Sequence, residues 1–358
     1  MENLNNLKKF YKNKRIFITG HTGFKGTWLS IILSYLDAKI YGYSLAPEKK
    51  SLFEITKIKN RFSSNTYATI TNINNLKKKI RTSNPEIVFH LAAQPLVIDS
   101  YKKPLETFNT NLMGTLYLLE CLKDVKSIKS VIIVTTDKVY KINKKSKSYK
   151  ESDQLGGTEP YSTSKVGAEI VTACYIKSFF QNSKLKNKIS IARAGNVIGG
   201  GDFAKNRLVP DIIKCINNKK KLKIRNPNHV RPWQHVLDPI VGYLILAKKQ
   251  YDEKINGDNQ FAWNFGPKKH NFKKVNEVVK YIQKFESFKY SIDKKKKFQE
   301  TSILKLNSTK AKLKLGWICK WNLSTAIKRT IEWNKAVKEN FSPKKKCMQQ
   351  FLMYINNK

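Results

Sequence analysis

Acidic residues are scarce in this chain of 358 residues, which has 26 Asp and Glu against 69 Lys and Arg and a formal net charge of +43. Such an excess can indicate nucleic-acid binding. Here, however, the lysine runs are dispersed along the chain and are not interleaved with aromatic residues, and arginine, the better base reader, is sparse. The pattern argues against a specific nucleic-acid partner and favours faster association with an anionic substrate. The lysine runs lie at 77–79, 144–145, 219–221, 294–297 and 344–346.

Long apolar runs and paired cysteines are also missing. The apolar fraction is 41%, and no run approaches the roughly 18 apolar residues that a membrane helix needs. The N-terminal MENLNNLKKFYKNKR contains no apolar segment of a secretory leader. The five cysteines form no CxxC pair, so we expect neither a disulfide framework nor a metal site. These absences predict a cytoplasmic protein without membrane insertion.

Short apolar runs alternate with longer amphipathic stretches over the first two-thirds of the chain. This alternation predicts an α/β fold with a Rossmann-type doubly wound parallel sheet. The expected strands are 15–19, 39–44, 66–70, 86–91, 130–135 and 189–194. The expected helices are 25–36, 73–83, 101–123 and 160–182.

The pattern becomes looser after residue 195. We therefore expect residues 1–195 to form a dinucleotide-binding domain that carries the catalytic residues. Residues 196–358 are expected to form mainly a smaller substrate-binding region, with some elements that return to the sheet. The lysine-rich 292–298 is expected to be a solvated loop. Segments rich in Gly, Pro and Asn, expected to be loops, lie at 195–206, 225–232 and 264–270.

A glycine fingerprint, GHTGFKG, follows the first expected strand and precedes the first amphipathic helix. Glycines at 20, 23 and 26 allow a tight turn and a close approach to a pyrophosphate, which the amides and dipole of the following helix attract. A plain strand–helix turn can also use glycine, but this context favours dinucleotide binding. The second strand ends in YSLAP, which lacks both an acid for a ribose hydroxyl and an arginine for a 2′-phosphate. We favour NAD over NADP because a phosphate clamp is missing.

A second motif is EPYSTSK, in which Tyr161 and Lys165 are four residues apart and share one face of a helix. A tyrosine that acts as a base near neutral pH must lower its pKa by about three units, or about 4 kcal/mol, and a nearby ammonium favours the phenolate. A YxxxK pattern can also arise by chance. Pro160 suits the first turn of a helix and supports the catalytic interpretation.

A third motif, VIIVTTDKVY, ends a buried strand with two hydroxyls, an acid and a base. Ligands of doubly wound sheets bind beyond the carboxyl ends of the strands, where Thr136, Asp137 and Lys138 would lie. Thr and Asp also begin turns, so these residues alone leave a purely structural role open.

Taken together, these motifs resemble the extended short-chain dehydrogenase/reductases, and within them the nucleotide-sugar 4,6-dehydratases. The resemblance extends to LKLGWICKWNLSTAIKRTIEW at 313–333. TTDKVY, with Lys where most members have Glu, and IRNPNHVRPWQHVLDP at 224–239 resemble the members that act on CDP-glucose. The matching motifs are GHTGFKG, HLAAQ, NTNLMGT, TTDKVY, EPYSTSK and RAGNVIGGGDF.

The resemblance implies that CDP-glucose loses water to give CDP-4-dehydro-6-deoxyglucose, a precursor of surface polysaccharide. In that scheme Tyr161, assisted by Lys165 and Thr136, takes the proton of the 4-hydroxyl while NAD accepts hydride from carbon 4. Asp137 protonates the departing 6-hydroxyl. Lys138 or a neighbouring group removes the proton from carbon 5, or Lys138 only stabilises the developing enolate.

Further site residues follow from the same resemblance. Asn111 would support the sheet beside the active site or act as a buried polar brace. Two departures weaken details of binding: Asn72 and Asn307 stand where Asp is usual. The implied cofactor-binding residues are Gly20, Gly23, Phe24, Gly26, Ala92, Tyr161 and Lys165, and the implied substrate-binding residues are Asn196, Arg207, Arg231 and His235.

Helices 101–123 and 160–182 would form a four-helix interface in a homodimer. Two other functions remain open from the sequence: another nucleotide-sugar 4,6-dehydratase or 4-epimerase, and a non-catalytic basic nucleic-acid-binding protein on a Rossmann fold. The apolar residues expected on the interface are Leu112, Leu116, Leu119, Ile170, Val171 and Ile176.

Overall fold

A seven-stranded parallel sheet forms the centre of the computed structural model, which describes residues 3–142, 148–255, 261–293 and 301–356. The strand order is β11-β6-β5-β4-β1-β2-β3, and every neighbouring pair is parallel. The predicted Rossmann-type doubly wound sheet is therefore confirmed. Its strands are β1 (Arg15–Thr19), β2 (Lys39–Ser44), β3 (Ser64–Tyr67), β4 (Ile87–His90), β5 (Ser130–Thr136), β6 (Ile189–Ala194) and β11 (Ala262–Phe265).

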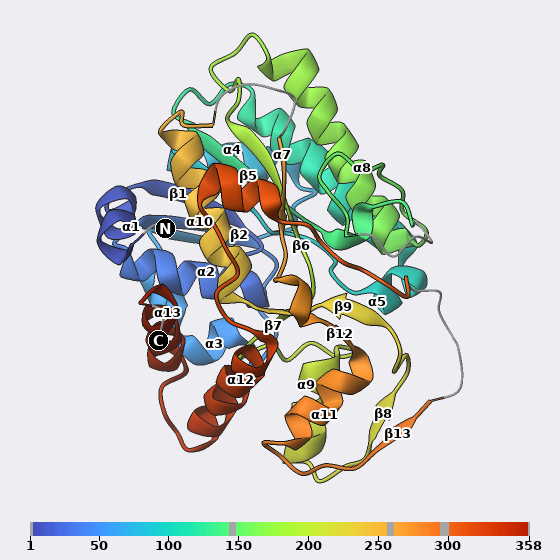
Figure 1. Ribbon diagram of the computed structural model, residues 1–358. Helices are drawn as coiled ribbons and strands as arrows, with labels where there is room; N and C mark the ends of the chain where they lie inside the picture. Colours follow the sequence, from blue (N-terminus) through green and yellow to red (C-terminus); the bar gives the residue numbers. More distant parts are fainter. Residues whose placement is uncertain (1–2, 143–147, 256–260, 294–300, 357–358) are drawn as a thin grey trace.

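Helices cover both faces of this sheet (Figure 1). Successive residues of a strand point to opposite faces. Ile132 of β5 accordingly packs in the core under one helical layer, whereas Val131 and Ile133 pack in the core under the other. The first layer contains α1 (Leu4–Tyr11), α2 (Phe24–Tyr35), α3 (Leu52–Thr56), α10 (Leu237–Tyr251) and α13 (Pro343–Ile355), and the second contains α4 (Ile73–Ser83), α7 (Gly114–Leu122) and α8 (Pro160–Tyr175).

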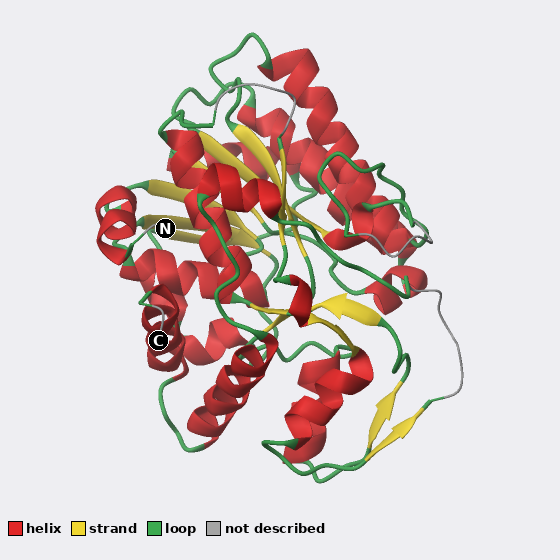
Figure 2. Cartoon of the chain, viewed as in Figure 1, coloured by secondary structure: helices red, strands yellow, loops and turns green. Residues whose placement is uncertain are grey.

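A smaller region lies beyond the sheet, in the lower part of Figures 1 and 2, and has a hydrophobic core of its own. It consists of three helices and three short strand pairs. The helices are α9 (Leu208–Asn217), α11 (Val275–Gln283) and α12 (Leu323–Lys338). The strand pairs are β7 (Val197–Ile198) with β10 (Gln234–His235), β8 (Leu222–Ile224) with β13 (Tyr290–Ile292), and β9 (Val230–Pro232) with β12 (Phe272–Lys274).

The expected single helix over 101–123 is wrong. The chain forms α5 (Val97–Lys102), α6 (Pro104–Phe108), a π-helical turn over Asn109–Met113 and then α7. Pro104 has no amide hydrogen and cannot continue a helix, but it fits the first position of a new one.

Other boundaries differ for equally local reasons. The helix expected over 160–182 is α-helical only to Tyr175 and continues as a π-helical turn over Ile176–Phe180. The strand expected over 66–70 is β3, which ends at Tyr67, because Thr69 and Thr71 form a side-chain hydrogen bond in the following turn.

The segments after residue 195 that were expected to be loops contain short strands or parts of strands. Four-residue β11 overlaps the loop expected over 264–270, and β7 and β9 lie within the other two expected loops. Lysine runs 144–145 and 294–297, the second within the loop expected over 292–298, lie outside the described residues. Among the described residues, no helix is long and apolar enough to cross a membrane.

The turn between β1 and α2 leaves no room for a side chain at two of its glycines. Gly20 has φ +74°, and a Cβ there would lie 2.5 Å from the backbone nitrogen of Ala92. A Cβ on Gly26 would lie 2.2 Å from the carbonyl oxygen of Gly20. At Gly23 the nearest heavy atom to an added Cβ is the Gly20 carbonyl oxygen at 3.5 Å, an ordinary contact. The fold itself thus requires two of the three glycines.

We predict that Gly26→Ala destabilises the protein by about 1–3 kcal/mol, because its methyl group would force the backbone of the turn apart. Gly23→Ala is the matched control, since its methyl group displaces nothing, and it should lower the melting temperature much less, only by the modest preference for Gly over Ala at the N-cap of α2. Thermal unfolding of both variants checks the pair. Equal melting temperatures would show that the turn relaxes and that Gly26 is not required by packing.

Candidate active site

The carboxyl end of β5 meets the first turn of α8, and three predicted residues converge there. The side chain of Thr136 lies close enough to the hydroxyl of Tyr161 to lower the pKa of the phenol. The Thr136 hydroxyl also donates to Oδ1 of Asp137 at 3.1 Å. The phenol and the carboxyl therefore both lie beside Thr136.

The first turn of α8 is fixed by an N-cap that the sequence analysis did not identify. The carboxylate of Glu159 accepts from the amides of Tyr161 at 2.8 Å and Ser162 at 3.0 Å. The Ser162 hydroxyl accepts from the amide of Glu159, which completes a capping box. Ser100 adds a second acceptor for the Tyr161 amide at 3.1 Å. These bonds hold Tyr161 at one position relative to β5.

The electrostatics of Tyr161 differ from the sequence-based expectation. Burial raises the pKa of its phenol to about 12, and the charges of Asp137 and Glu159 act in the same direction. The side chain of Thr136 and the charge of Arg207 oppose this rise in pKa. In the ligand-free protein Tyr161 is therefore a neutral phenol at neutral pH.

Lys165 lies one turn beyond Tyr161 on the same helix and is buried. Burial lowers the pKa of its ammonium to about 8, and the charge of Glu169 opposes that change. Its Nζ donates to the carbonyl of Val134 at 3.4 Å, a long bond. The lysine is thus still mostly protonated at neutral pH, but it gives up its proton at a lower pH than an exposed lysine.

The carboxyl of Asp137 is 2% exposed, and its Oδ2 has no hydrogen-bond partner among the residues that the structure describes. Burial raises the pKa of Asp137, whereas the charges of Lys138 and Arg231 lower it. A carboxyl that holds its proton to a higher pH than usual is suited to donate one. Lys138 also acts on the buried carboxyl of Glu159, so its charge lies within reach of both acids.

The glycine fingerprint presents an uncapped helix end. The N-cap residue of α2 is Gly23, which is exposed and offers no side-chain cap to the first amides. Phe24 packs beside Gly199, and Ala92 lies beside Gly20, so the predicted residues of the groove surround one turn. A turn that requires glycine on its inner side and keeps an open amide end fits a dinucleotide pyrophosphate.

Lys25 is a site residue that sequence reasoning missed. It lies in the first turn of α2, and burial lowers the pKa of its ammonium to about 8, assisted by the charges of Arg207 and Lys165. The carboxylates of Asp137 and Asp202 have the opposite effect on its pKa. The lysine of GHTGFKG was the available signal, because a cation at a helix N-terminus opposes the helix dipole.

Three predicted substrate residues lie near this cluster or face it. Arg207 pairs with Asp202 at 3.1 Å, and its charge reaches Tyr161 and Lys25. Arg231 is buried; it donates to the carbonyls of Val230 and Ser302, and its charge acts on Asp137. Asn196 is half-buried, two residues beyond the end of β6, and its carbonyl accepts from the amide of Gln234; no contact of Asn196 with the cluster is observed among the described residues.

His235 does not fit the predicted role. Its side chain is fully buried, its Nδ1 accepts from the amide of Leu237 at 3.2 Å, and its ring packs edge-on against Trp28 and Trp321. Burial lowers the pKa of the imidazole to about 3. His235 is therefore a core residue in this structure and is not among the residues that we propose to bind the substrate.

The three asparagines singled out from the sequence have local structural roles. Asn111 is fully buried, accepts from the amide of Gln94 and donates to Oγ of Ser164, so it braces the loop after β4 against α8. Asn72 caps α4 by accepting from the amide of Asn75. Asn307 accepts from the amide of Thr309 in a turn.

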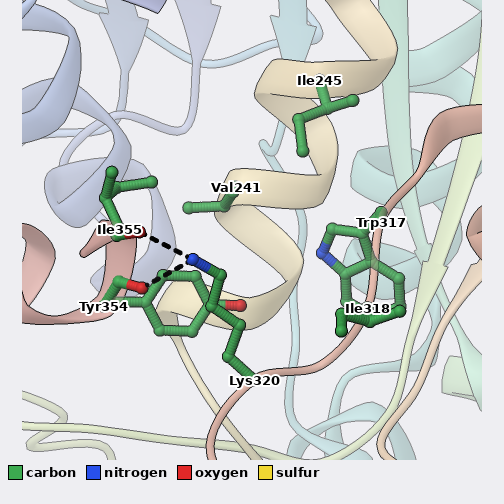
Figure 3. Close-up of a pocket in the computed structure, with 7 residues that line it drawn as sticks. All are labelled: Val241, Ile245, Trp317, Ile318, Lys320, Tyr354 and Ile355. Carbon is green, nitrogen blue, oxygen red and sulfur yellow. Dashed lines mark hydrogen bonds between the residues drawn. The ribbon is translucent and has the colours of Figure 1, made fainter. Parts of the chain in front are cut away.

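One small cavity lies away from this cluster, between α10 and the C-terminal segment (Figure 3). Lys320 closes it by donating to the carbonyls of Tyr354 and Ile355, as the dashed lines in Figure 3 show. The remaining lining residues are apolar and include Val241 and Ile245. The cavity contains none of the predicted site residues.

Comparison with known proteins agrees with the geometry. The family model described as GDP-mannose 4,6 dehydratase matches residues 17–330. The chain is 42% identical to CDP-glucose 4,6-dehydratase of Salmonella typhimurium over 335 residues, which is 92% of each protein.

Solved structures with the same fold include dTDP-glucose 4,6-dehydratase of Bacillus anthracis in complex with NAD (TM-score 0.74, 22% identity, covering 92% of this chain and 99% of that one). UDP-glucose 4-epimerase of Thermotoga maritima with UDP-glucose has a TM-score of 0.76 and 22% identity, with 90% and 99% covered. The membership predicted from the motifs is confirmed: the chain belongs to the nucleotide-sugar 4,6-dehydratase family described by the GDP-mannose 4,6 dehydratase model.

Proposed function

We propose that this enzyme converts CDP-D-glucose to CDP-4-dehydro-6-deoxy-D-glucose and water, with NAD as its bound cofactor. The observation that carries the proposal is the line Tyr161–Thr136–Asp137, which places a phenol and a protonatable carboxyl at one strand end beside the glycine turn. The 42% identity to a CDP-glucose 4,6-dehydratase supports the choice of nucleotide. A 4-epimerase would need the tyrosine but not the acid.

Tyr161 begins the reaction by accepting the proton of the sugar 4-hydroxyl. Its pKa of about 12 in the ligand-free protein means that bound ligands and the ammonium of Lys165 must stabilise the phenolate. Thr136, beside the phenol, assists by lowering its pKa. NAD, when bound, supplies the acceptor for the hydride of carbon 4 and returns that hydride to carbon 6.

Asp137 completes the dehydration by protonating the 6-hydroxyl, so that the bond from carbon 6 to oxygen breaks and water leaves. The 4-ketone acidifies the hydrogen on carbon 5, whose removal provides the electron pair of the new double bond. Lys138 is the nearest predicted group for this proton or for the enolate charge. The proton returns to carbon 5 when carbon 6 receives the hydride, so the atoms balance.

Binding relies on the positive charges around the site. The first turn of α2 would hold the cofactor pyrophosphate, with Gly20, Gly23 and Gly26 giving access. Arg207 and Arg231 would bind the substrate diphosphate, because a guanidinium contacts phosphate at two points. We also propose that the dinucleotide-binding domain ends and the substrate-binding region begins at residue 195. A cytoplasmic location is proposed as well, with the five free cysteines as its support.

The substrate is tested by incubating the enzyme with CDP-, TDP-, GDP- and UDP-glucose and measuring product mass. We expect CDP-glucose to lose the mass of one water at the highest rate. A product of unchanged mass would indicate an epimerase. Turnover that favours another nucleotide would overturn the CDP assignment but not the dehydration.

Asp137→Asn should separate oxidation from water loss. Hydride transfer from carbon 4 stays possible while the acid is missing, so a stable absorbance of reduced cofactor should accumulate and the rate of dehydration should fall by about 100-fold or more. The same variant also tests the effect of Asp137 on stability. Because the pKa of Asp137 is raised in the folded protein, ionising it lowers the free energy of unfolding as the pH rises above about 4. The variant should therefore melt no lower than wild type at pH 8.

Asp124→Asn is the matched control, since Asp124 is exposed on the surface, and it should change neither the absorbance nor the rate. Normal dehydration by Asp137→Asn would exclude the acid role.

The predicted homodimer is part of the proposal, with a revised interface. Leu119 is fully buried in the core beneath the sheet and cannot contribute to the dimer, whereas Leu105 on α6 is 85% exposed and Ile170 on α8 is 57% exposed. Leu112 packs against Gly167.

We expect sedimentation to show a dimer at micromolar concentration and the combined Leu105→Asp, Ile170→Asp variant to be monomeric. Leu313→Asp, at another exposed leucine, should remain dimeric. A monomeric wild type, or a dimer that survives the double change, would contradict this surface.

A further inference from the structure

A buried carboxylate lies one further turn along the catalytic helix. Tyr161, Lys165 and Glu169 are spaced by four residues on α8 and share one face. Glu169 is 1% exposed. An ionised carboxylate in such a place needs strong partners, and it lies directly behind the lysine of the site.

Its partners come from the two strands that end at the site. Arg193 of β6 donates from Nε to both carboxylate oxygens at 3.0 Å, and from Nη2 to Oε2. Thr135 of β5 donates to Oε1 at 2.6 Å. Thr135 immediately precedes Thr136, so the carboxylate ties the catalytic end of β5 to α8.

The network continues away from the site. Arg193 donates from Nη1 to the hydroxyl of Tyr140 at 2.8 Å, and that hydroxyl donates to Asn264 of β11 at 2.6 Å. The guanidinium is therefore held on both sides. Its geometry fixes the carboxylate and leaves it little freedom to follow Lys165 if the lysine moves.

The charges that face Lys165 are unequal. The ammonium of Lys25 repels it, and His90, also within reach, is kept neutral because burial lowers the imidazole pKa to about 3. Glu169 is the carboxylate whose charge favours the protonated lysine. Within the described part of the chain, the hydrogen bond of the Lys165 Nζ is the long one to Val134.

Stability alone is a weak reason for such a pair. Replacing a buried ion pair by apolar residues of similar volume is often neutral or stabilising. We propose that Glu169, fixed by Arg193 and Thr135, is a positioning residue that keeps Lys165 charged and in place. The proposal rests on the proposed function for its catalytic meaning, because the charged lysine is what favours the phenolate of Tyr161.

The test measures Lys165 directly. Trace acetylation with acetic anhydride at a series of pH values, quantified on the Lys165 peptide by mass spectrometry, gives the titration midpoint of that lysine without any turnover. We compare wild type with Glu169→Met/Arg193→Met, which removes both charges and retains bulk. The midpoint should fall by about one unit or more, and the alkaline limb of kcat/KM should move to lower pH with it.

Three further variants make the result decisive. Glu169→Gln supplies a second readout if the double variant does not fold. Glu169→Asp keeps the charge and should restore the midpoint. Asp238→Asn removes another buried carboxylate, on α10, and should leave the titration midpoint of Lys165 unchanged.

An unchanged midpoint in a folded variant that lacks the Glu169 carboxylate would overturn the proposal, even if its melting temperature falls. If wild type turns over no nucleotide sugar, the proposed function fails while the acetylation result still decides the role of Glu169.

Discussion

The contact between the end of β5 and the first turns of α8 is the constraint on which the site depends. The strand contributes the hydroxyl and the acid, and the helix contributes the phenol and the lysine. A shift of one element by an ångström would break the Tyr161–Thr136–Asp137 line, and such a misplacement is costly for proton transfer. The structure secures the contact twice, with the Glu159 cap at the helix start and the Glu169–Arg193 pair two turns later.

Burial sets the protonation states of this site. It raises the pKa of the acid and the phenol and lowers the pKa of both lysines, so each group is moved toward its neutral form. In the proposed function, a nucleotide sugar and a dinucleotide would both bring negative charge to Lys25 and Arg207. The site is therefore expected to reach its working charge only when it is filled, and the net charge of +43 acts in the same direction.

The sequence predicted what depends on local chemistry. GHTGFKG requires a turn with a forced φ at Gly20 and a close approach at Gly26, and the structure contains both. Buried strands and the YxxxK pair are likewise local patterns. The position of His235 could not be predicted from a local pattern. A histidine in a loop motif gives the same sequence pattern whether its ring contacts a ligand or packs against two tryptophans.

The residues that the sequence did not reveal are those whose roles depend on tertiary contacts. Glu169 reads as an ordinary helical acid until Arg193, 24 residues away, is seen to pair with it. Lys25 reads as a solvated lysine until its neighbours across the groove are known. Pro104 was visible, but the long apolar pattern around it suggested one continuous helix. Each of these depends on packing between elements, which a linear pattern does not contain.

The most direct test of the account follows a label through the site. CDP-glucose with deuterium on carbon 4 should give a dehydrated product that carries the deuterium on carbon 6, because the same bound cofactor removes and returns the hydride. Nuclear magnetic resonance of the product locates the label. A dehydrated product without deuterium, or a sugar that keeps it on carbon 4, would contradict the proposed internal transfer.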